Sequence, residues 1–314
     1  MPNYNGVWSL VTQYQYAADW SADNISPATA AANGIAIISN ASGLQTVSVA
    51  TAGNSTDFGD FTTQRGKGGG FGSTTRGIVG GGNVGPSNIL DFITFTTAGD
   101  ATDFGDLTVA REEVTAHSSS TRGLVAGGDT GSKSDVVDYV TIASAGNATD
   151  FGNLAAANTS PSGAGSSVRM VVGGGIEGSR TNRIQYFTIS STGNSTDFGD
   201  LSAARQQGDA LSNATRTVFT GGYESSSSNT LEFVTTDTTG NVTDFGNLSE
   251  GSRRLASTSN ATRGIIAGGD GTNLRSKIEF ITIASAGNSA SFGNLLANTD
   301  SCNSGFSSAH GGLQ

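Results

Sequence analysis

The sequence predicts an all-β protein: a six-bladed β-propeller of four-stranded antiparallel blades, with one blade shared by the two ends of the chain. A nine-residue phrase of the form GNxTDFGNL returns six times, and its phenylalanines are Phe58, Phe104, Phe151, Phe198, Phe245 and Phe292. Their spacing is 46 residues once and 47 residues four times, which is the signature of a repeat architecture. Each unit holds four short apolar runs, and the incomplete units at the two ends complement each other.

One unit, residues 111–157, shows the four expected strands in order. REEVTAHSSS can form the first strand, and TRGLVAGG at 121–128 forms a second, apolar strand that two glycines end. After a polar loop, VVDYVTI at 136–142 is rich in β-branched residues, which favour a half-buried strand. Gly146–Asn147 is a tight turn of the hairpin kind, and ATDFGNL follows as the fourth strand. Four antiparallel strands per unit are typical of a propeller blade.

The number of blades follows from a count of first strands. They are expected to begin near 65, 111, 158, 205, 252 and 299. The second, third and fourth strands of the remaining blade are expected at 34–39, 44–49 and 56–61. A strand at about 300–308 would then complete that blade as its inner strand. Such closure removes the exposed sheet edges that invite aggregation. The propeller domain is therefore predicted to span 34–314, preceded by a segment 1–33 that does not repeat.

Composition excludes several classes of protein. The net charge is −10, so a nucleic-acid backbone would be repelled. The one cysteine, Cys302, allows no internal disulfide. The first 20 residues carry neither a basic region nor a long apolar run, so we expect no signal peptide and no membrane insertion.

Two sets of charged residues recur with the phrase. Aspartates precede the phenylalanines, and arginines follow them by eighteen residues. The sets are Asp57, Asp103, Asp150, Asp197 and Asp244, and Arg76, Arg122, Arg169, Arg216 and Arg263. The sixth slots hold Ser291 and His310, so both charges are missing together. We interpret the sets as salt bridges between neighbouring blades, such as Asp57 with Arg76. A ring of anion sites made by the arginines is the alternative, and a calcium site at the phrase is a weaker one. The phenylalanines themselves are expected to pack between blades.

Residues able to carry chemistry are scarce. His117 and His310 are too isolated in the sequence for a histidine metal site, and His117 is expected to face the channel from an inner strand. GKGGGFG at 66–72 imitates a phosphate loop but lacks its G-K-[ST] ending. We therefore expect no enzyme and no cofactor.

The loops after the double glycines differ from repeat to repeat and should gather on one face. Variable loops on a rigid scaffold are where binding usually occurs. The side chains expected to face a ligand are Asp129, Glu177, Arg180, Tyr223, Glu224 and Arg275. The alternative is that these loops are solvated turns.

The segment 1–33 concentrates aromatic residues: Tyr4, Trp8, Tyr14, Tyr16 and Trp20. Aromatic side chains dominate interface energetics, so we expect this segment to anchor the protein or to form oligomer contacts. The alternative is a tail that folds back and plugs the propeller.

The order of features in each unit resembles the Kelch repeat: an inner strand that begins with Arg, an apolar strand ending in Gly-Gly, an aromatic third strand and an outer strand with a large aromatic. Phe stands where Kelch repeats usually have Trp. The paired wording ATDFGDLT and SSTRGLVAGG also resembles repeats in structural and tail-fibre-like proteins of marine phages, especially cyanophages.

The phage resemblance implies a non-enzymatic virion protein, made in the host cytoplasm, that displays the propeller for host attachment. Its partners would be other virion proteins through 1–33, further copies of itself in the particle, and a host surface glycan or protein. A carbohydrate-binding propeller outside any virion is the alternative.

Overall fold

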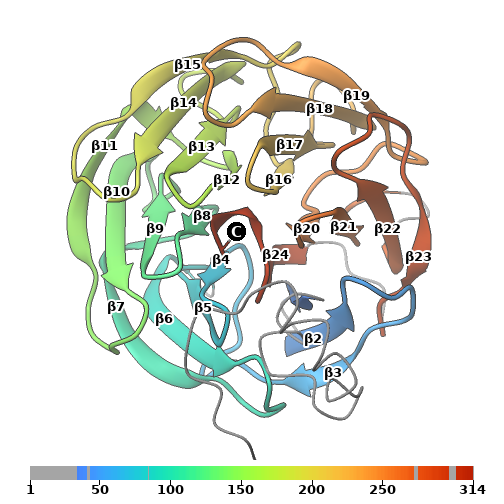
Figure 1. Ribbon diagram of the computed structural model, residues 1–314. Helices are drawn as coiled ribbons and strands as arrows, with labels where there is room; N and C mark the ends of the chain where they lie inside the picture. Colours follow the sequence, from blue (N-terminus) through green and yellow to red (C-terminus); the bar gives the residue numbers. More distant parts are fainter. Residues whose placement is uncertain (1–33, 41–42, 84, 272–274, 297–301, 314) are drawn as a thin grey trace, which may run out of the picture.

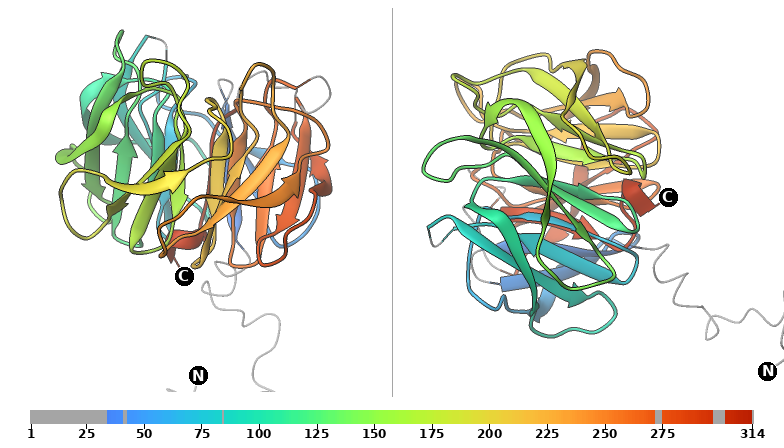
Figure 2. Two further views of the ribbon diagram at one scale, coloured as in Figure 1. Left: turned by 90° about the horizontal axis from the view of Figure 1, so that it is seen from above. Right: turned by 90° about the vertical axis from the view of Figure 1, so that its left-hand side faces the viewer.

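The computed structural model describes residues 34–40, 43–83, 85–271, 275–296 and 302–313. They form six four-stranded antiparallel sheets arranged as a ring around a central channel (Figure 1). The predicted all-β, six-bladed propeller is confirmed. Edge-on views show the blades standing side by side, with the C-terminus on one face of the ring (Figure 2).

Blade 1 consists of β24 (Cys302–Ser307), β1 (Ile35–Asn40), β2 (Gly43–Ser48) and β3 (Thr56–Gly59). Blade 2 consists of β4 (Gly69–Gly72), β5 (Arg76–Gly80), β6 (Ser87–Thr94) and β7 (Thr102–Arg111). Blade 3 consists of β8 (Thr115–Ser118), β9 (Arg122–Ala126), β10 (Ser134–Thr141) and β11 (Thr149–Asn158).

Blade 4 consists of β12 (Ser162–Gly165), β13 (Arg169–Gly173), β14 (Arg183–Thr188) and β15 (Thr196–Asp200). Blade 5 consists of β16 (Asp209–Ser212), β17 (Arg216–Thr220), β18 (Thr230–Thr235) and β19 (Thr243–Asn247). Blade 6 consists of β20 (Ala256–Ser259), β21 (Arg263–Ala267), β22 (Lys277–Thr282) and β23 (Ala290–Asn294).

The shared blade closes the ring as predicted. β24 pairs antiparallel with β1, for example Phe306 opposite Ile37, and supplies the inner strand of blade 1. The inner strands of blades 2 to 6 begin four residues later than expected, because the expected starts lie where the chain crosses from one blade to the next. Two of them, Arg111 and Asn158, are the last residues of β7 and β11. The residues between the crossing and the inner strand form the site described below.

The repeated phenylalanines pack between blades, as predicted. Six separate apolar clusters are present, each made by two neighbouring blades, and each contains one of these phenylalanines. All six rings are at most 5% exposed. Burying each contributes roughly 1.5–3 kcal/mol. In blades 2 to 6 the ring also meets the aromatic of the third strand edge to face, as Tyr139 and Phe151 do at 5.9 Å.

The rest of the phrase forms a clasp, in which the Gly-Asn turn of one blade docks on the Phe-Gly strand of the preceding blade. Between blades 3 and 4, the Gly193 amide donates to the Phe151 carbonyl at 2.8 Å, and the Asn153 amide donates to Asn194 Oδ1 at 3.0 Å. A Cβ on Gly152, whose φ is +146°, would collide with the Gly193 carbonyl. Only glycine allows this approach, which explains why the phrase is repeated almost unchanged.

The predicted Asp–Arg salt bridges between blades are wrong. Within the described residues no ion pair joins the two sets, and the five aspartates are exposed on the clasp strands. The arginines do cross between blades, but they donate to a main-chain carbonyl of the next blade. Arg122, for example, donates to Ile189 O at 3.0 Å and lies 4.5 Å above the Tyr139 ring. A carbonyl and a π face satisfy the guanidinium, so no carboxylate is needed.

A different set of ion pairs is fully buried. Arg65–Asp91, Arg111–Asp138 and Arg205–Glu232 lie at 2.6, 2.7 and 2.6 Å, with side chains at most 4% exposed. In each pair the arginine stands on the turn into the blade and the acid on the third strand. Blade 4 has Asn158 and Gln185 at the same two positions.

Candidate binding site at the mouth of the central channel

Five residues at the start of the inner strands adopt the left-handed backbone conformation, although none is glycine. Their φ angles lie between 55° and 57°. They occupy the same position in blades 2 to 6 and are Lys67, Glu113, Ser160, Gln207 and Arg254. Such a conformation costs of order 1–3 kcal/mol for a non-glycine residue and clusters at functional sites. We call these five residues the mouth ring.

A chain of main-chain hydrogen bonds holds the mouth ring together. The amides of Glu113, Ser160, Gln207 and Arg254 each donate to the carbonyl of the preceding member, at 2.8, 3.0, 3.1 and 2.7 Å. Neighbouring blades are thereby tied at the channel, and each side chain is fixed in direction by a rigid backbone.

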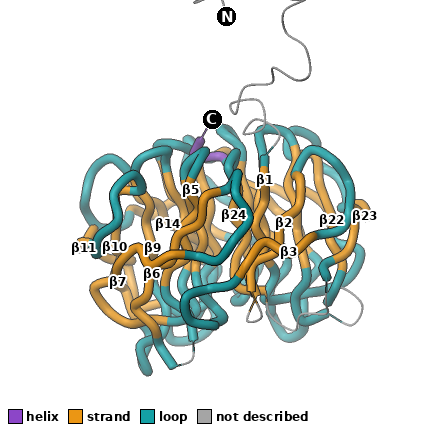
Figure 3. The backbone as a smooth tube through the Cα atoms, turned by 90° about the horizontal axis from the view of Figure 1, so that it is seen from below, coloured by secondary structure: helices purple, strands orange, loops and turns teal. Residues whose placement is uncertain are grey.

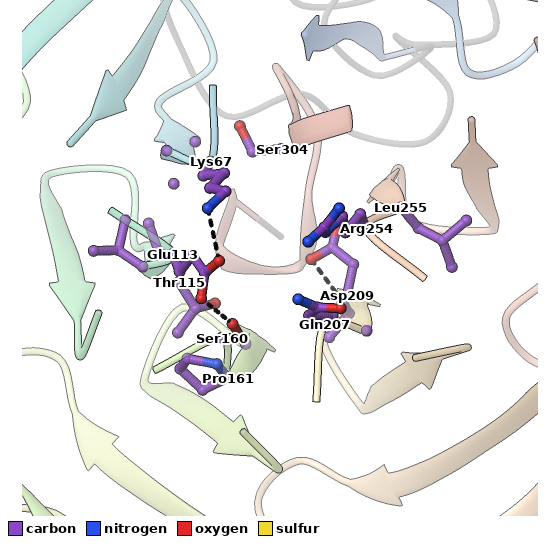
Figure 4. A pocket seen from close by; sticks show the side chains of 18 of the residues that line it. Lys67, Glu113, Thr115, Ser160, Pro161, Gln207, Asp209, Arg254, Leu255 and Ser304 are labelled. Carbon is purple, nitrogen blue, oxygen red and sulfur yellow. Dashed lines mark hydrogen bonds and ion pairs between the residues drawn. The ribbon is translucent and has the colours of Figure 1, made fainter. Parts of the chain in front are cut away.

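The mouth ring surrounds a cavity of about 90 Å³ that is open to solvent on one side. Its wall combines glycine backbone and apolar side chains with polar groups. Figure 4 shows two polar groups on opposite sides: Lys67, Glu113 and Ser160 on one, and Gln207, Asp209 and Arg254 on the other.

The first group places one cation between two carboxylates. Lys67 Nζ lies 2.9 Å from Glu113 and 3.3 Å from Glu112, and Glu113 also accepts from Ser160 Oγ at 2.5 Å. Burial disfavours both charges, but the hydrogen bonds and the opposite charges outweigh it. The pKa of Lys67 is therefore raised and that of Glu113 lowered.

The polar atoms of the second group are less completely hydrogen-bonded. Asp209 begins β16, and its carboxylate accepts the amides of Ala210 at 2.8 Å and Ser257 at 2.5 Å. Burial raises the pKa of Asp209 to about 7, although the two amides oppose the shift. Gln207 Oε1 is buried with no hydrogen-bond partner among the described residues.

Replacing Asp209 with Asn should stabilise the protein more at pH 8 than at pH 5. The folded-state pKa of about 7 lies above the ordinary 3.8, so the folded protein holds a proton that the unfolded chain has lost. The stability that this proton provides is therefore lost as pH rises through 7. Because Asp209 is partly exposed, solvent screening reduces this pH dependence. We expect the increase in unfolding free energy caused by Asp209→Asn to be about 1–2 kcal/mol larger at pH 8 than at pH 5. Urea unfolding at both pH values measures it, and an equal gain would contradict the assignment.

The opposite end of the channel is closed by the end of the chain. β24 leads into residues 308–310 and the short 3₁₀ helix η3 (Gly311–Leu313), which contacts β8, β12 and β16. Figure 3 shows this helix on one face of the ring, and Figure 1 places the C-terminus at its centre. We call residues 308–313 the plug. The cavity opens on the other face.

Two buried histidines meet at the plug: His310 belongs to it, and His117 lies on β8. The rings of His117 and His310 meet at 5.3 Å, and their Nε2 atoms donate to Ser166 O at 3.1 Å and Gly72 O at 2.9 Å. Burial lowers the pKa of His117 to about 3, assisted by the charge of His310, and lowers that of His310 to about 4. His117 faces the channel from an inner strand, as predicted. The described residues contain no group of three potential metal ligands.

The predicted ligand-facing residues lie on the mouth face but outside the cavity. Glu177, Arg180, Tyr223 and Glu224 gather where the loops of blades 4 and 5 meet, and Arg180 and Glu224 border a separate shallow hollow there. The Tyr223 ring lies between Arg180 and Arg253, at 5.5 and 4.6 Å. Asp129 Oδ1 accepts the Gly131 amide inside its own turn at 2.7 Å, and Arg275 lies 3.8 Å from Asp270.

The aromatic residues proposed as anchor contacts, Tyr4, Trp8, Tyr14, Tyr16 and Trp20, lie outside the described residues. Among the residues that the structure does describe, no helix has the length and hydropathy needed to cross a membrane. No protein-family model matches the sequence, and no curated protein is significantly similar to it.

Proposed function

We propose that this protein is a non-enzymatic component of a phage particle that displays its propeller for attachment to a host surface. The observation that carries the proposal is that residue 34, which follows the segment 1–33, lies on one face of the ring, and the cavity lies on the other. Gly34, the first described residue, lies on the plug face: the next residue, Ile35, donates its amide to Ser308 Oγ at 3.0 Å. The cavity and the variable loops lie on the opposite face. A particle bound through 1–33 would therefore leave the cavity pointing outward.

The wording of the repeats supports the same proposal. The unit resembles the Kelch repeat in its order of features, and the paired phrases resemble repeats of marine phage structural proteins. In this proposal residues 1–33 contact other virion proteins and further copies of the chain. The mouth face contacts a glycan or protein of the host.

Deleting residues 1–33 should leave a folded propeller that no longer enters particles. The expected reason is that the aromatic residues of this segment make the contacts with the particle. Particles assembled with each form are purified by density gradient and probed for the protein, while circular dichroism and thermal melting check the fold. A Trp8→Ala/Trp20→Ala double variant, which keeps the chain length, is the matched control. Normal incorporation of the deleted form would overturn the proposed anchor.

A second candidate is a carbohydrate-binding propeller that works outside a virion. It is favoured by the polar wall of the cavity, which suits a small hydroxylated ligand. Binding to a glycan array without any association with particles would favour this candidate, whereas association with particles would favour the first.

A further inference from the structure

Arg254 is the one cation of the cavity wall without a charged partner in the described residues. Lys67 is engaged by two glutamates, and the neighbouring Arg253 pairs with Asp270 at 2.7 Å. The two consecutive arginines point to different sides: Arg253 reaches the loop of blade 6, while Arg254 lines the cavity. A half-buried guanidinium in such a place is suited to bidentate pairing with a carboxylate brought by a ligand.

An unused acceptor lies on the same wall. Gln207 Oε1 is buried and without a partner in the described structure, and its backbone carbonyl accepts the Arg254 amide at 2.7 Å. A buried acceptor without a hydrogen-bond donor is destabilising. A ligand hydroxyl would satisfy it, and further hydroxyl partners on the wall are Thr115, Ser160 and Ser304.

The two sides of the cavity differ in charge. Lys67 lies between two carboxylates, Glu113 and Glu112. On the other side the wall carries Arg254 and Asp209, and burial favours the neutral, protonated form of Asp209. In a chain whose net charge is −10, an anion is therefore favoured beside Arg254 and disfavoured over most of the remaining surface.

We propose that the cavity binds one carboxylate-bearing sugar residue of an acidic surface glycan, with the carboxylate on Arg254 and a hydroxyl on Gln207. This inference rests on the proposed attachment function and names its ligand class. A sugar acid fits because the wall offers one free cation together with donors and acceptors for hydroxyls. The plug closes the far end, so the site takes a terminal residue or side branch and has no through-going groove for an extended peptide.

The test is calorimetric titration of the full-length chain with sodium D-glucuronate, D-glucose, acetate and an N-acetylated glutamate amide. We expect glucuronate to bind at least about tenfold more tightly than glucose, because only the acid pairs with Arg254. Acetate should bind more weakly than glucuronate, because it has no hydroxyl for Gln207.

Arg254→Gln should weaken glucuronate binding by about tenfold or more. Gln is the residue that blade 5 already carries at this position with φ 57°, so the left-handed backbone can accommodate it. Arg180→Gln is the matched control, since it removes a cation of the same face outside the cavity, and it should bind glucuronate like the parent chain. An unchanged melting temperature of Arg254→Gln shows that the loss comes from the site.

Three results would overturn the proposal: equal glucuronate affinity in Arg254→Gln and the parent chain, no binding of glucuronate, or equal or tighter binding of acetate or of the glutamate amide. The last result would assign the site to carboxylates in general or to acidic peptides. Because these titrations involve no particle, their failure is distinct from a failure of the anchoring experiment on residues 1–33.

Discussion

Removing residues 299–314 should open the ring and cause the protein to aggregate. β24 is the inner strand of blade 1 and pairs with β1 from Ala36 to Asn40. Without it, the backbone edge of β1 is exposed to solvent, although nearly all residues of this strand are buried in the intact ring. An exposed strand edge is a template for pairing with other chains. The inner walls of blades 2 and 6 lose their neighbour as well, because β24 contacts both β4 and β20.

Phe306 carries much of the expected loss. Its side chain is 2% exposed, and its ring lies 5.9 Å from that of Phe95. Gly70 and Gly77 of blade 2 pack directly on the ring, so it fills space that the glycines leave open. Truncating such a phenylalanine to Ala costs about 3–5 kcal/mol, and the deletion also removes the hydrogen bonds to β1, each contributing about 0.5–1.5 kcal/mol net.

Light scattering and thermal melting of the deleted protein measure the outcome. The control removes only 309–314, which opens the floor of the channel but keeps β24 in place, and this variant should remain monomeric. If the 299–314 deletion stays monomeric and melts at the parent temperature, β24 does not latch the ring.

The fold could be predicted because repetition makes weak signals add up. A single TDFG phrase means little, but five copies and one variant, ASFG, at nearly one period fix the blade, its outer strand and the position of each buried phenylalanine. Closure could be predicted for the same reason, since the partial units at 34–61 and 300–308 complete one unit of known length.

The partners of the recurring arginines could not be predicted from the fact that Asp and Arg are both replaced in the sixth repeat. Ser291 and His310 coincide because they belong to the last repeat, where the chain turns into the plug, and not because they are partners. Arg76 and its equivalents need only an acceptor, and a carbonyl at the end of the next blade supplies it. Spacing in the sequence does not show which acceptor is used.

The mouth ring escaped prediction because its members share a backbone conformation and not a chemistry. Lys67, Glu113, Ser160, Gln207 and Arg254 differ in charge and size, and none is the glycine or asparagine that usually marks a left-handed residue. Comparison between repeats makes such a position look unconstrained. The available signal was its register, nine residues after each phrase phenylalanine.

The buried ion pairs had left a signal in the sequence. Seven residues after the phrase phenylalanine stand Arg65, Arg111, Asn158, Arg205 and Ser252, and the matching third-strand residues are Asp91, Asp138, Gln185, Glu232 and Glu279. In every repeat that has the arginine, the third-strand residue is an acid, and in the repeat that has the asparagine it is a glutamine. Blade 4 thus offers a neutral version of the same junction.

Replacing Arg111 with Met should destabilise the protein by about 3–5 kcal/mol, because it leaves a fully buried carboxylate without its cation. Arg111 and Asp138 are both 0% exposed in their side chains and lie 2.7 Å apart. Arg111 also donates to Gly127 O at 2.8 Å and Val136 O at 2.5 Å. Val136 O keeps the Gly127 amide as a donor at 3.0 Å, whereas Gly127 O loses its arginine donor. Urea unfolding at pH 7 measures the loss.

The double variant Arg111→Asn/Asp138→Gln tests whether the charge itself is needed. In blade 4, Asn158 Nδ2 donates to Gly174 O at 2.8 Å, and Gln185 Oε1 accepts the Ala155 amide at 2.9 Å. Gly127 and Thr108 are the equivalents of Gly174 and Ala155, and the Thr108 amide already donates to Asp138 at 3.2 Å. The neutral pair should therefore restore part of the stability lost in Arg111→Met, since it pairs Gly127 O and the Thr108 amide without desolvating two charges. A double variant as unstable as the single one would show that the ion pair contributes more than its hydrogen bonds, and that the neutral junction depends on the packing of blade 4.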